Sequence, residues 1–435
     1  MTTPWLEDEK LNSRNGSIIE GDGREIARQL LMEWGGAPLH YFAFLPDKRY
    51  LSDGGSHPRW SIAYRLVGRH ALALGDPLGD PLGDPLAAPE AIRAFLSECR
   101  RRRWTPAFYQ VTPEHLTAYR AAGLRSVKVG EEARIVLKEF SLAGKRFKNL
   151  RNDLRRVEKA GVALESYGPD ALPEAQTVQE MAALCDGWRR AHRAGEAGFA
   201  MGGFDPDSTL FKESRTLAAR ELKTGELLAF ATFVPAFGAE GDSGWTLDLM
   251  RRRPNALHGV MDFLLVSAAK IFAEEGAQLL SLGLSPLSGS ADHLESRQTA
   301  LIRHFLFRRM GRVYNFQGLH AFKSKFATHW EPRYLISRPG TALALTAGAI
   351  LKAHVTSAEP EQKRFPRIQI RRRGLVLAAL LLLLLSPYEK TLAKRAVSHP
   401  RRWAHFHPLH FHPHLLHFHT DRTSDRQFPQ DAPAA

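Results

Sequence analysis

The sequence has few of the features that mark secreted or disulfide-stabilised proteins. Only two of its 435 residues are cysteine, Cys99 and Cys185, and neither has a histidine or a second cysteine at metal-ligand spacing. We therefore expect no disulfide framework, no zinc site and a reducing compartment. The acidic start MTTPWLEDEK contains no apolar run, so no signal peptide is expected either.

Long apolar runs are also scarce. Residues 375–385 form an unbroken apolar run of eleven residues behind three arginines, whereas a helix needs roughly 20 residues to span a bilayer. Two interpretations stay open for this segment: an interfacial anchor with a basic flank, and a helix that packs on the protein. The histidine-rich stretch 399–419 has no fixed ligand spacing and is expected to be a disordered tail.

Acidic residues are outnumbered. The 60 Lys and Arg against 46 Asp and Glu give a net charge of +14, which favours an anionic partner such as nucleic acid or acidic lipid headgroups. A hydrophobic content of 44% is ordinary for a globular protein. The length fits two domains of roughly 150 residues plus tails.

Periodicity predicts an α/β (α+β) protein in which the order strand, helix, strand occurs in both halves. Helices are expected at 24–34, 89–102, 113–122, 145–160, 175–193 and 256–275. Strands are expected at 40–45, 60–66, 71–74, 105–111, 127–137, 218–222, 227–234, 245–250 and 279–284. The predicted organisation is a polar lead-in (1–22), two related domains (23–165 and 170–340), a candidate anchor (341–390) and the histidine-rich tail (391–435).

Two segments stand out by composition. Residues 75–86 read GDPLGDPLGDPL, a turn-forming tetrapeptide repeat that is most simply a duplicated loop, since it lacks the Lys-Ser/Thr of a phosphate-binding loop. Residues 145–160 form a basic helix that is expected to end at Gly161. This helix is either a solvated face with internal ion pairs or a cationic rail for tRNA or lipid phosphates.

A dozen short motifs, in order over about 290 residues, resemble the cytosolic C-terminal domain of the phosphatidylglycerol lysyltransferase (multiple peptide resistance factor) family. In the first half they include Asp47-Lys48-Arg49-Tyr50, Ala73-Leu74-Gly75-Asp76-Pro77, Phe108-Tyr109-Gln110, Lys128 to Ala133, and Lys148 to Asn152. In the second half they include Gly198-Phe199 with Gly203-Phe204, Leu228 to Ala231, Asp248-Leu249-Met250-Arg251, Gly259 to Asp262, Leu282 to Leu287, and Tyr314-Asn315-Phe316 through Lys323 to Tyr334.

The resemblance implies two GNAT-type acyltransferase domains in tandem, with the chemistry in the second. The implied reaction moves lysine or alanine from aminoacyl-tRNA to phosphatidylglycerol and needs no cofactor and no metal. The implied partners are aminoacyl-tRNA, phosphatidylglycerol and an anionic membrane surface, at the cytoplasmic face of a bacterial plasma membrane. The flippase domain that often precedes this unit is not in the sequence, so a separate flippase would have to translocate the product.

The implied catalytic residues are Asp248, Arg251 and Lys323. Asp248 ends an apolar strand, where desolvation would raise its pKa and suit it to accept or orient a hydroxyl proton. Arg251 could bind the lipid phosphate or keep Asp248 ionised. By pattern alone, Asp248 could equally cap the following turn.

Lys323 and Lys325 alternate with Phe and Ser in AFKSKF, which predicts a strand with both lysines on one face. A lysine near the developing oxyanion fits the reaction, although a solvated strand face fits the pattern as well. Further substrate-binding candidates are Lys325, Ser285, Arg151, Lys148 and Glu131. Ser285 lacks the GxSxG context of a catalytic serine.

Three alternatives remain open. The first is a tRNA-dependent aminoacyltransferase with another lipid or a peptide as acceptor. The second is a CoA-dependent N-acyltransferase, although Arg120-Ala121-Ala122-Gly123 lacks the second small residue of a pyrophosphate-binding loop. The third is a basic membrane-surface or RNA-binding adaptor with a degenerate site.

Overall fold

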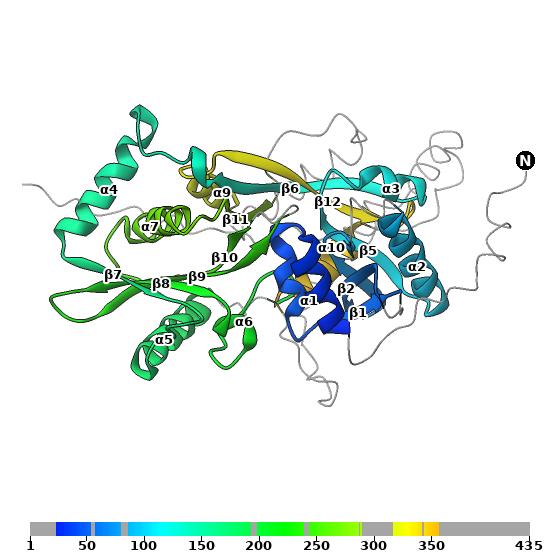
Figure 1. Cartoon of the computed structure of the whole chain (residues 1–435), viewed down its shortest axis with the longest axis horizontal. Coiled ribbons are helices and arrows are strands. Elements are labelled where there is room, and N and C mark those ends of the chain that lie inside the picture. Colours follow the sequence, from blue (N-terminus) through cyan, green and yellow to red (C-terminus); the bar gives the residue numbers. More distant parts are fainter. Residues whose placement is uncertain are drawn as a thin grey trace, which may run out of the picture. The chain divides into compact units, whose positions relative to one another are not determined.

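The computed structural model describes residues 23–53, 57–79, 86–192, 198–238, 243–286, 288, 316–341 and 343–355. Its centre is a 12-stranded mixed sheet in which β1-β2-β3-β5-β12-β6-β11-β10-β9-β8-β7 lie side by side, with the two-residue β4 (Leu78–Gly79) paired to β2 (Figure 1). The predicted mixed α/β class is therefore confirmed. Among the described residues, no helix is both long and apolar enough to cross a membrane.

The same order of elements occurs in both halves of the sheet. Each half has an antiparallel three-stranded meander, a crossover helix to a parallel strand, a short helix and a last long strand. In the first half these are β1 (Arg49–Ser52), β2 (Trp60–Val67), β3 (His70–Leu74), α2 (Ala87–Arg101), β5 (Thr105–Val111), α3 (Leu116–Ala121) and β6 (Arg125–Val136). In the second they are β8 (Arg215–Glu221), β9 (Leu227–Phe237), β10 (Ser243–Arg252), α7 (Val260–Glu274), β11 (Leu279–Pro286), α9 (Phe316–Lys323) and β12 (His329–Ser337).

The two halves exchange their last strands. β6 leaves the first half and pairs antiparallel with β11 of the second, while β12 of the second half pairs antiparallel with β5 of the first. β6 and β12 also pair with each other along their length, and they form the long central strands of Figure 1. The sheet therefore runs without a break from the first predicted domain into the second. The division into two domains stays a prediction.

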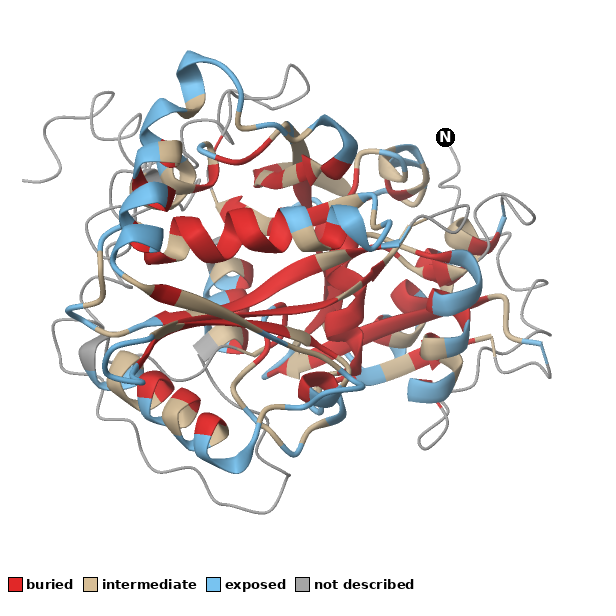
Figure 2. Ribbon diagram, turned by 60° about the vertical axis from the view of Figure 1, so that its left-hand side comes forward, coloured by how far each residue is buried: buried red, intermediate tan, exposed pale blue. Residues whose placement is uncertain are grey.

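Helices cover both faces of the sheet, which explains why most strands read as continuous apolar runs. In the second half, α7 packs on the face that carries Leu217 and Ala219, and α5 (Ala175–His192) packs on the face that carries Ala218. In the first half, α2 and α3 cover one face, while α1 (Gly23–Trp34) and α10 (Leu343–Val355) cover the other. Figure 2 shows that the central strands and most of α7 are buried, whereas the C-terminal end of α7 has exposed residues.

Two predicted strands are wrong. Residues 40–44 of the predicted strand 40–45 lie in a buried 3-10 helix, η2 (Pro38–Phe44), and Leu45 follows its end. The apolar run of this segment has no period that could tell a strand from a helix. The AFKSKF segment is the end of α9 followed by a turn, so Lys323 and Lys325 do not share a strand face. The remaining predicted helices and strands occur with shifted ends; the predicted helix at 113–122, for example, is shortened to α3.

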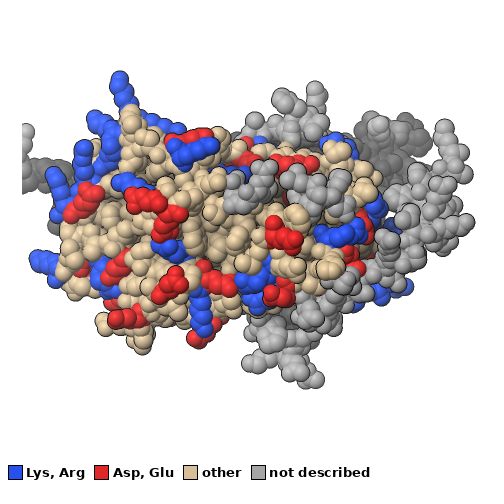
Figure 3. Space-filling model, in the orientation of Figure 1, with Lys and Arg blue, Asp and Glu red and all other residues tan. Residues whose placement is uncertain are grey.

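The basic helix is confirmed as α4 (Lys148–Lys159) after a short 3-10 turn, η4 (Lys145–Phe147). Gly161 has a φ of 72° and donates its N–H to the Glu158 carbonyl at 3.0 Å, as a helix-ending glycine does. Lys and Arg side chains gather over the region where Figure 1 places α4 (Figure 3). β7 (Val162–Tyr167) follows at the edge of the sheet.

The first copy of the GDPL repeat is built into the core. Asp76 is only 5% exposed, and its carboxylate accepts bonds from the Thr112 N–H at 2.9 Å and hydroxyl at 2.8 Å and from the Tyr119 hydroxyl at 3.2 Å. The turn prediction holds for Gly75, whose φ is 69°. Residues 80–85 of the repeat lie outside the described residues.

Candidate active site

The central feature of the candidate site is the point where β10 and β11 stop pairing. These parallel strands are bonded from Gly244↔Leu279 to Thr246↔Ser281, and both then continue for several residues beyond the last pair. Just beyond the last pair, β10 has a register shift against β9, and β11 has one against β6. Bulges of this kind are frequent next to active sites because they re-aim side chains.

The bulge in β10 places Asp248 and Arg251 on the same face of the sheet. Residues three apart on a regular strand point to opposite faces, but the register against β9 shifts between Leu247 and Met250. Met250 therefore returns to the α7 side with Leu247, and Arg251 faces α5, where its guanidinium lies 4.1 Å from the centre of the Trp188 ring.

Both side chains are buried. Asp248 is 8% exposed and accepts the Gly202 N–H at 2.6 Å; Arg251 is 7% exposed and donates to the Met250 carbonyl at 3.0 Å. Within the described part of the chain, the Arg251 Nε is buried and has no hydrogen-bond partner. A buried guanidinium nitrogen without a partner is costly, so it suits an anionic or carbonyl group of a ligand.

Lys323, the last residue of α9, contacts β11 just beyond the point where β11 stops pairing with β10. Its Nζ donates to the Leu284 carbonyl at 2.8 Å and the Gly283 carbonyl at 3.1 Å, both just past the last β10–β11 pair. Burial lowers the pKa of this ammonium to about 7, and the charge of Glu132 opposes the shift. A lysine with that pKa can exchange a proton near neutral pH.

Lys325 lies elsewhere. Its ammonium bonds to both carboxylate oxygens of Asp262, at 2.9 and 2.8 Å, and so ties the turn after α9 to the first turn of α7. The structure thus separates the two lysines that the sequence placed together. Lys325 serves the packing of α9 on α7 in this conformation.

Ser285 and Glu131 face each other across β11 and β6 beyond the Lys323 contact. Ser285 is fully buried, and its hydroxyl lies 3.5 Å from the Nδ1 of His320, one helical turn before Lys323. Glu131 accepts a bond from the Lys128 ammonium at 2.8 Å. These two candidates are therefore grouped with Lys323 at the end of β11.

Lys148 and Arg151 belong to α4 and not to this group. Lys148 is exposed, and the Arg151 guanidinium donates to the carbonyls of Leu142 and Gly144, the latter at 2.9 Å, in the loop before the helix. Arg151 stabilises the start of α4 in this way. Of these two candidates, Lys148 is the one whose side chain is exposed on the basic surface.

Asp76 is the counterpart of Asp248 in the first half of the sheet. Asp76 lies two residues past Leu74, the last residue of β3 paired to β5, just as Asp248 lies two residues past Thr246. The Thr112 and Tyr119 hydroxyls donate hydrogen bonds to the Asp76 carboxylate, and burial raises the pKa of Asp76. Asp76 therefore holds β3, β5 and α3 together in the first half.

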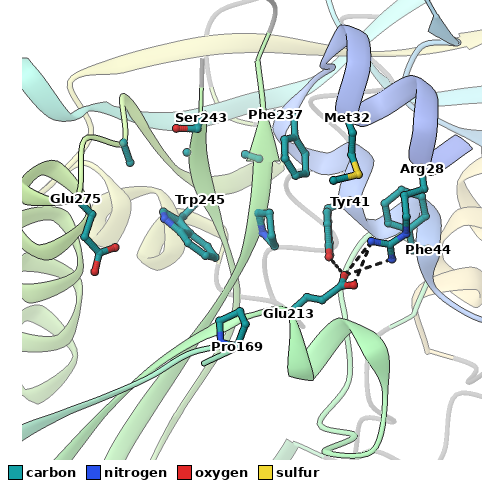
Figure 4. A pocket seen from close by; sticks show the side chains of 14 residues that line it. Arg28, Met32, Tyr41, Phe44, Pro169, Glu213, Phe237, Ser243, Trp245 and Glu275 are labelled. Atoms are coloured by element: carbon teal, nitrogen blue, oxygen red, sulfur yellow. Dashed lines mark hydrogen bonds and ion pairs between the residues drawn. The ribbon is translucent and has the colours of Figure 1, made fainter. Parts of the chain in front are cut away.

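A cavity of about 480 Å³ lies at the other end of β10. Its walls include the aromatic residues Tyr41, Phe44, Phe237 and Trp245, and one rim carries Glu213, bonded to Arg28 and Tyr41 (Figure 4). Neither Asp248 nor Lys323 lines it. The cavity is therefore separate from the candidate catalytic group.

Sequence reasoning missed two participants. Gly202 was part of no predicted element, although the nearby Gly198-Phe199 pair was among the motifs. Trp188 lies in the predicted helix 175–193 and has no predicted role, yet it is partly exposed and stacks on Arg251. Neither contact has a local signal, because each joins segments more than 40 residues apart in the chain.

Residues 28–337 match the family model described as phosphatidylglycerol lysyltransferase, C-terminal. A phosphatidylglycerol lysyltransferase of Bacillus subtilis is 31% identical over 340 residues, and one of Staphylococcus aureus (strain COL) is 27% identical over 340 residues. The matches cover 77% and 78% of this chain but only 37% and 38% of those proteins. The chain thus spans less than two fifths of the length of these relatives.

Two solved structures are similar over most of this chain. The C-terminal domain of a putative lysylphosphatidylglycerol synthetase from Agrobacterium fabrum is 30% identical with a TM-score of 0.65, covering 78% of this chain and 98% of that one. The structure of L-PGS from Bacillus licheniformis is 27% identical with a TM-score of 0.63, covering 79% and 99%.

Proposed function

The chain belongs to the phosphatidylglycerol lysyltransferase C-terminal family, and from that premise we propose that it transfers an aminoacyl group, lysyl or alanyl, from tRNA to phosphatidylglycerol. A glycerol hydroxyl of the lipid attacks the ester carbonyl of aminoacyl-tRNA. The new ester bond forms, the bond to the terminal ribose breaks, and the ribose oxygen takes up a proton. The ester is already activated, so the protein has to align two reactants, move one proton and stabilise an oxyanion.

The observation that carries the proposal is the shared face of Asp248 and Arg251 at the point where β10 and β11 separate. Asp248 accepts or orients the proton of the attacking hydroxyl. The Arg251 guanidinium, whose Nε lacks a partner among the described residues, binds the lipid phosphate next to that hydroxyl. The two roles require one face, and the bulge supplies it.

Lys323 has the complementary role on the β11 side. Its ammonium is held by two carbonyls at the strand separation and has a pKa of about 7. In the protonated form it stabilises the negative oxygen of the tetrahedral intermediate, and it returns a proton to the departing ribose oxygen. Ser285 and Glu131 line the same end of β11 and contact the substrate there.

The basic helix α4 is the surface that we assign to the anionic partners. Aminoacyl-tRNA and an anionic membrane both present closely spaced phosphates, and α4 with η4 carries seven Lys and Arg residues against two acidic ones. We place the enzyme at the cytoplasmic face of a bacterial plasma membrane, held peripherally. A separate flippase would then distribute the aminoacylated lipid.

The test is a reconstituted assay with the full chain, phosphatidylglycerol vesicles and either lysyl-tRNA or alanyl-tRNA. Thin-layer chromatography with ninhydrin and mass spectrometry should show a new aminoacylated lipid, and RNase should stop its formation. Acetyl-CoA in place of aminoacyl-tRNA should give no product. Absence of the lipid product with both tRNAs would refute the proposed function, and product formation after RNase would refute tRNA dependence.

Asp248→Asn should lower turnover by about 100-fold or more, the size typical of losing a general base. Asp170→Asn removes an exposed carboxylate and is the matched control, with turnover expected at the wild-type level. Wild-type turnover in a folded Asp248→Asn variant would remove Asp248 from the mechanism.

A further inference from the structure

The segment of residues 198–202, here called the 198–202 strap, joins Asp248 to a second buried carboxylate. At one end the Phe199 N–H donates to the Asp47 Oδ2 at 3.0 Å. At the other end the Gly202 N–H donates to the Asp248 Oδ1 at 2.6 Å. Two carboxylates, one in the turn before β1 and one in β10, thus accept hydrogen bonds from backbone amides that are only three residues apart.

The Asp47 end is a buried cluster of charges. The Asp47 carboxylate bonds to the Lys48 ammonium and, at 2.8 Å, to the Arg65 guanidinium, and the side chains of all three residues are at most 10% exposed. Arg65 also donates to the Ala353 carbonyl at 2.7 Å, which adds the end of α10 to the cluster. Burial of paired charges is a poor source of stability, so a role in fixing one geometry explains the cluster better.

Phe199 is held in an unfavourable conformation by its packing. Its φ is 66°, in the left-handed region that a non-glycine residue seldom adopts. The ring is fully buried, stacks on Tyr109 at 5.9 Å and meets His354 edge-on at 5.6 Å. A strained backbone of this kind persists where many surrounding contacts hold it in place, and such strain is concentrated at functional sites.

The Asp248 end leaves space for no side chain. A Cβ built on Gly202 would lie 2.4 Å from the Asp248 Oδ2 and 3.0 Å from its Cγ. Only glycine therefore lets this amide reach the carboxylate. A hydrogen bond to a charged acceptor is also one of the stronger ones in proteins.

We propose that the 198–202 strap positions Asp248 for proton transfer and that Asp47, although it lies in the turn before β1, is a positioning residue for the reaction. The inference rests on the proposed function for the role of Asp248. Asp47 acts through Phe199 and Gly202: its charge holds the strained turn at Phe199, and the turn presents the Gly202 N–H to one oxygen of Asp248. This contact fixes the orientation of the Asp248 carboxylate.

Asp47→Asn tests this link because it keeps the size of the side chain and removes its charge. We expect kcat to fall about 10-fold while KM changes by less than about 2-fold, since the strap orients a catalytic group and does not itself bind substrate. Asp53→Asn is the matched control, because Asp53 also bonds an arginine, Arg59, and a backbone N–H. Its kcat should stay at the wild-type value.

Gly202→Ala tests the other end of the strap. The added methyl group must displace the Asp248 carboxylate, so kcat should fall by about 100-fold or more, as after loss of a general base. Gly348→Ala, in an exposed turn of α10 with open space around its Cβ, is the control and should leave kcat unchanged. Wild-type kcat in folded Asp47→Asn or Gly202→Ala protein would overturn the proposal.

Hydrogen exchange separates this inference from the proposed function, because it needs no turnover. Mass spectrometry of the peptide that covers residues 198–204 should show slow amide exchange in the wild type and in Asp53→Asn. Exchange should be at least about 10-fold faster in Asp47→Asn and in Asp248→Asn, each of which weakens one end of the strap. Unchanged exchange in both variants would overturn the proposal about the strap even if the enzyme is active. Faster exchange in the variants, together with a wild-type protein that makes no lipid product, would support the strap and refute the proposed function.

Discussion

Two lysines that lie two residues apart in the sequence, Lys323 and Lys325, have different electrostatic surroundings in the fold. Lys325 is paired with Asp262 and its side chain is 42% exposed. Lys323 is 5% exposed, and its bonds within the described chain go to carbonyl oxygens. Desolvation without a paired carboxylate disfavours the charged form, which is why the pKa of Lys323 falls to about 7 from 10.5.

This shift predicts a pH-dependent contribution to stability. The unfolded chain keeps the Lys323 proton up to about pH 10.5 and the folded chain only up to about pH 7. Burying this lysine therefore destabilises the fold most at pH 7 and below, and the destabilisation disappears as the pH rises to 10.5. Lys323→Met removes it. The wild-type free energy of unfolding, relative to that of the variant, should therefore rise by about 1 kcal/mol per pH unit between pH 7.5 and 9.5.

Urea unfolding of both proteins at several pH values measures that difference. Lys325→Met is the control, because it removes a lysine from the same turn whose ammonium is paired with Asp262 and whose side chain is 42% exposed. The rise for Lys323→Met should exceed that for Lys325→Met. A Lys323→Met difference that is flat across this range would contradict the lowered pKa.

At the level of elements, the bulge in β10 decides which side chains meet. Leu247 and Met250 are separated by an odd number of positions yet face the same core. The Thr232 hydroxyl of β9 accepts the Leu249 N–H at 3.1 Å and so satisfies the amide that the bulge removes from the ladder. A single hydroxyl on the neighbouring strand thus supports the arrangement of Asp248 and Arg251.

Thr232→Val should therefore destabilise the protein and impair the site together. It leaves a buried N–H without an acceptor, which costs about 1–3 kcal/mol, and turnover should fall because the bulge is no longer held. Thr346→Val is the matched control: the Thr346 hydroxyl in α10 is buried and lacks a partner among the described residues, so its removal should be neutral or stabilising. Denaturant unfolding and the lipid assay measure both effects, and equal stability changes for the two variants would contradict this role.

At the level of the whole molecule, the exchange of β6 and β12 makes the two halves depend on each other. A buried ion-pair network lies at their crossing, where Arg333 is fully buried and bonds Glu132, and the Ser281 hydroxyl donates to the same carboxylate. Burial alone would raise the pKa of Glu132, but Arg333 and Arg134 overcome it and lower the pKa. Removing one partner of such a network leaves a buried charge unpaired.

We expect the described halves to unfold in one transition. Differential scanning calorimetry of the full chain should show one cooperative peak for the sheet, because neither half retains its own last strand. Arg333→Met should lower the stability by about 3–5 kcal/mol and move the whole peak to lower temperature. Two separate peaks, or a variant that shifts only part of the peak, would show that the halves unfold independently.

The sequence by itself determined the mixed α/β class, most helices and strands, the end of the basic helix at Gly161, and the family. These follow from local periodicity, turn chemistry and the order of short motifs, all of which are written in consecutive residues. It also selected Asp248, Arg251 and Lys323 as candidates. The prediction at 40–45 is wrong because a short apolar run does not distinguish a helix from a strand, and the prediction in AFKSKF is wrong because alternation over six residues is too short to define a strand.

Only the tertiary structure decided how those residues are grouped. The strand exchange, the bulge that turns Arg251 toward the Asp248 face, and the strap from Asp47 to Asp248 all join segments distant in the chain. The physical reason is that register, desolvation and hydrogen-bond partners depend on which strand or loop arrives alongside. The same reason separates Lys325 from Lys323, whose neighbours along the chain are nearly identical and whose neighbours in space are not.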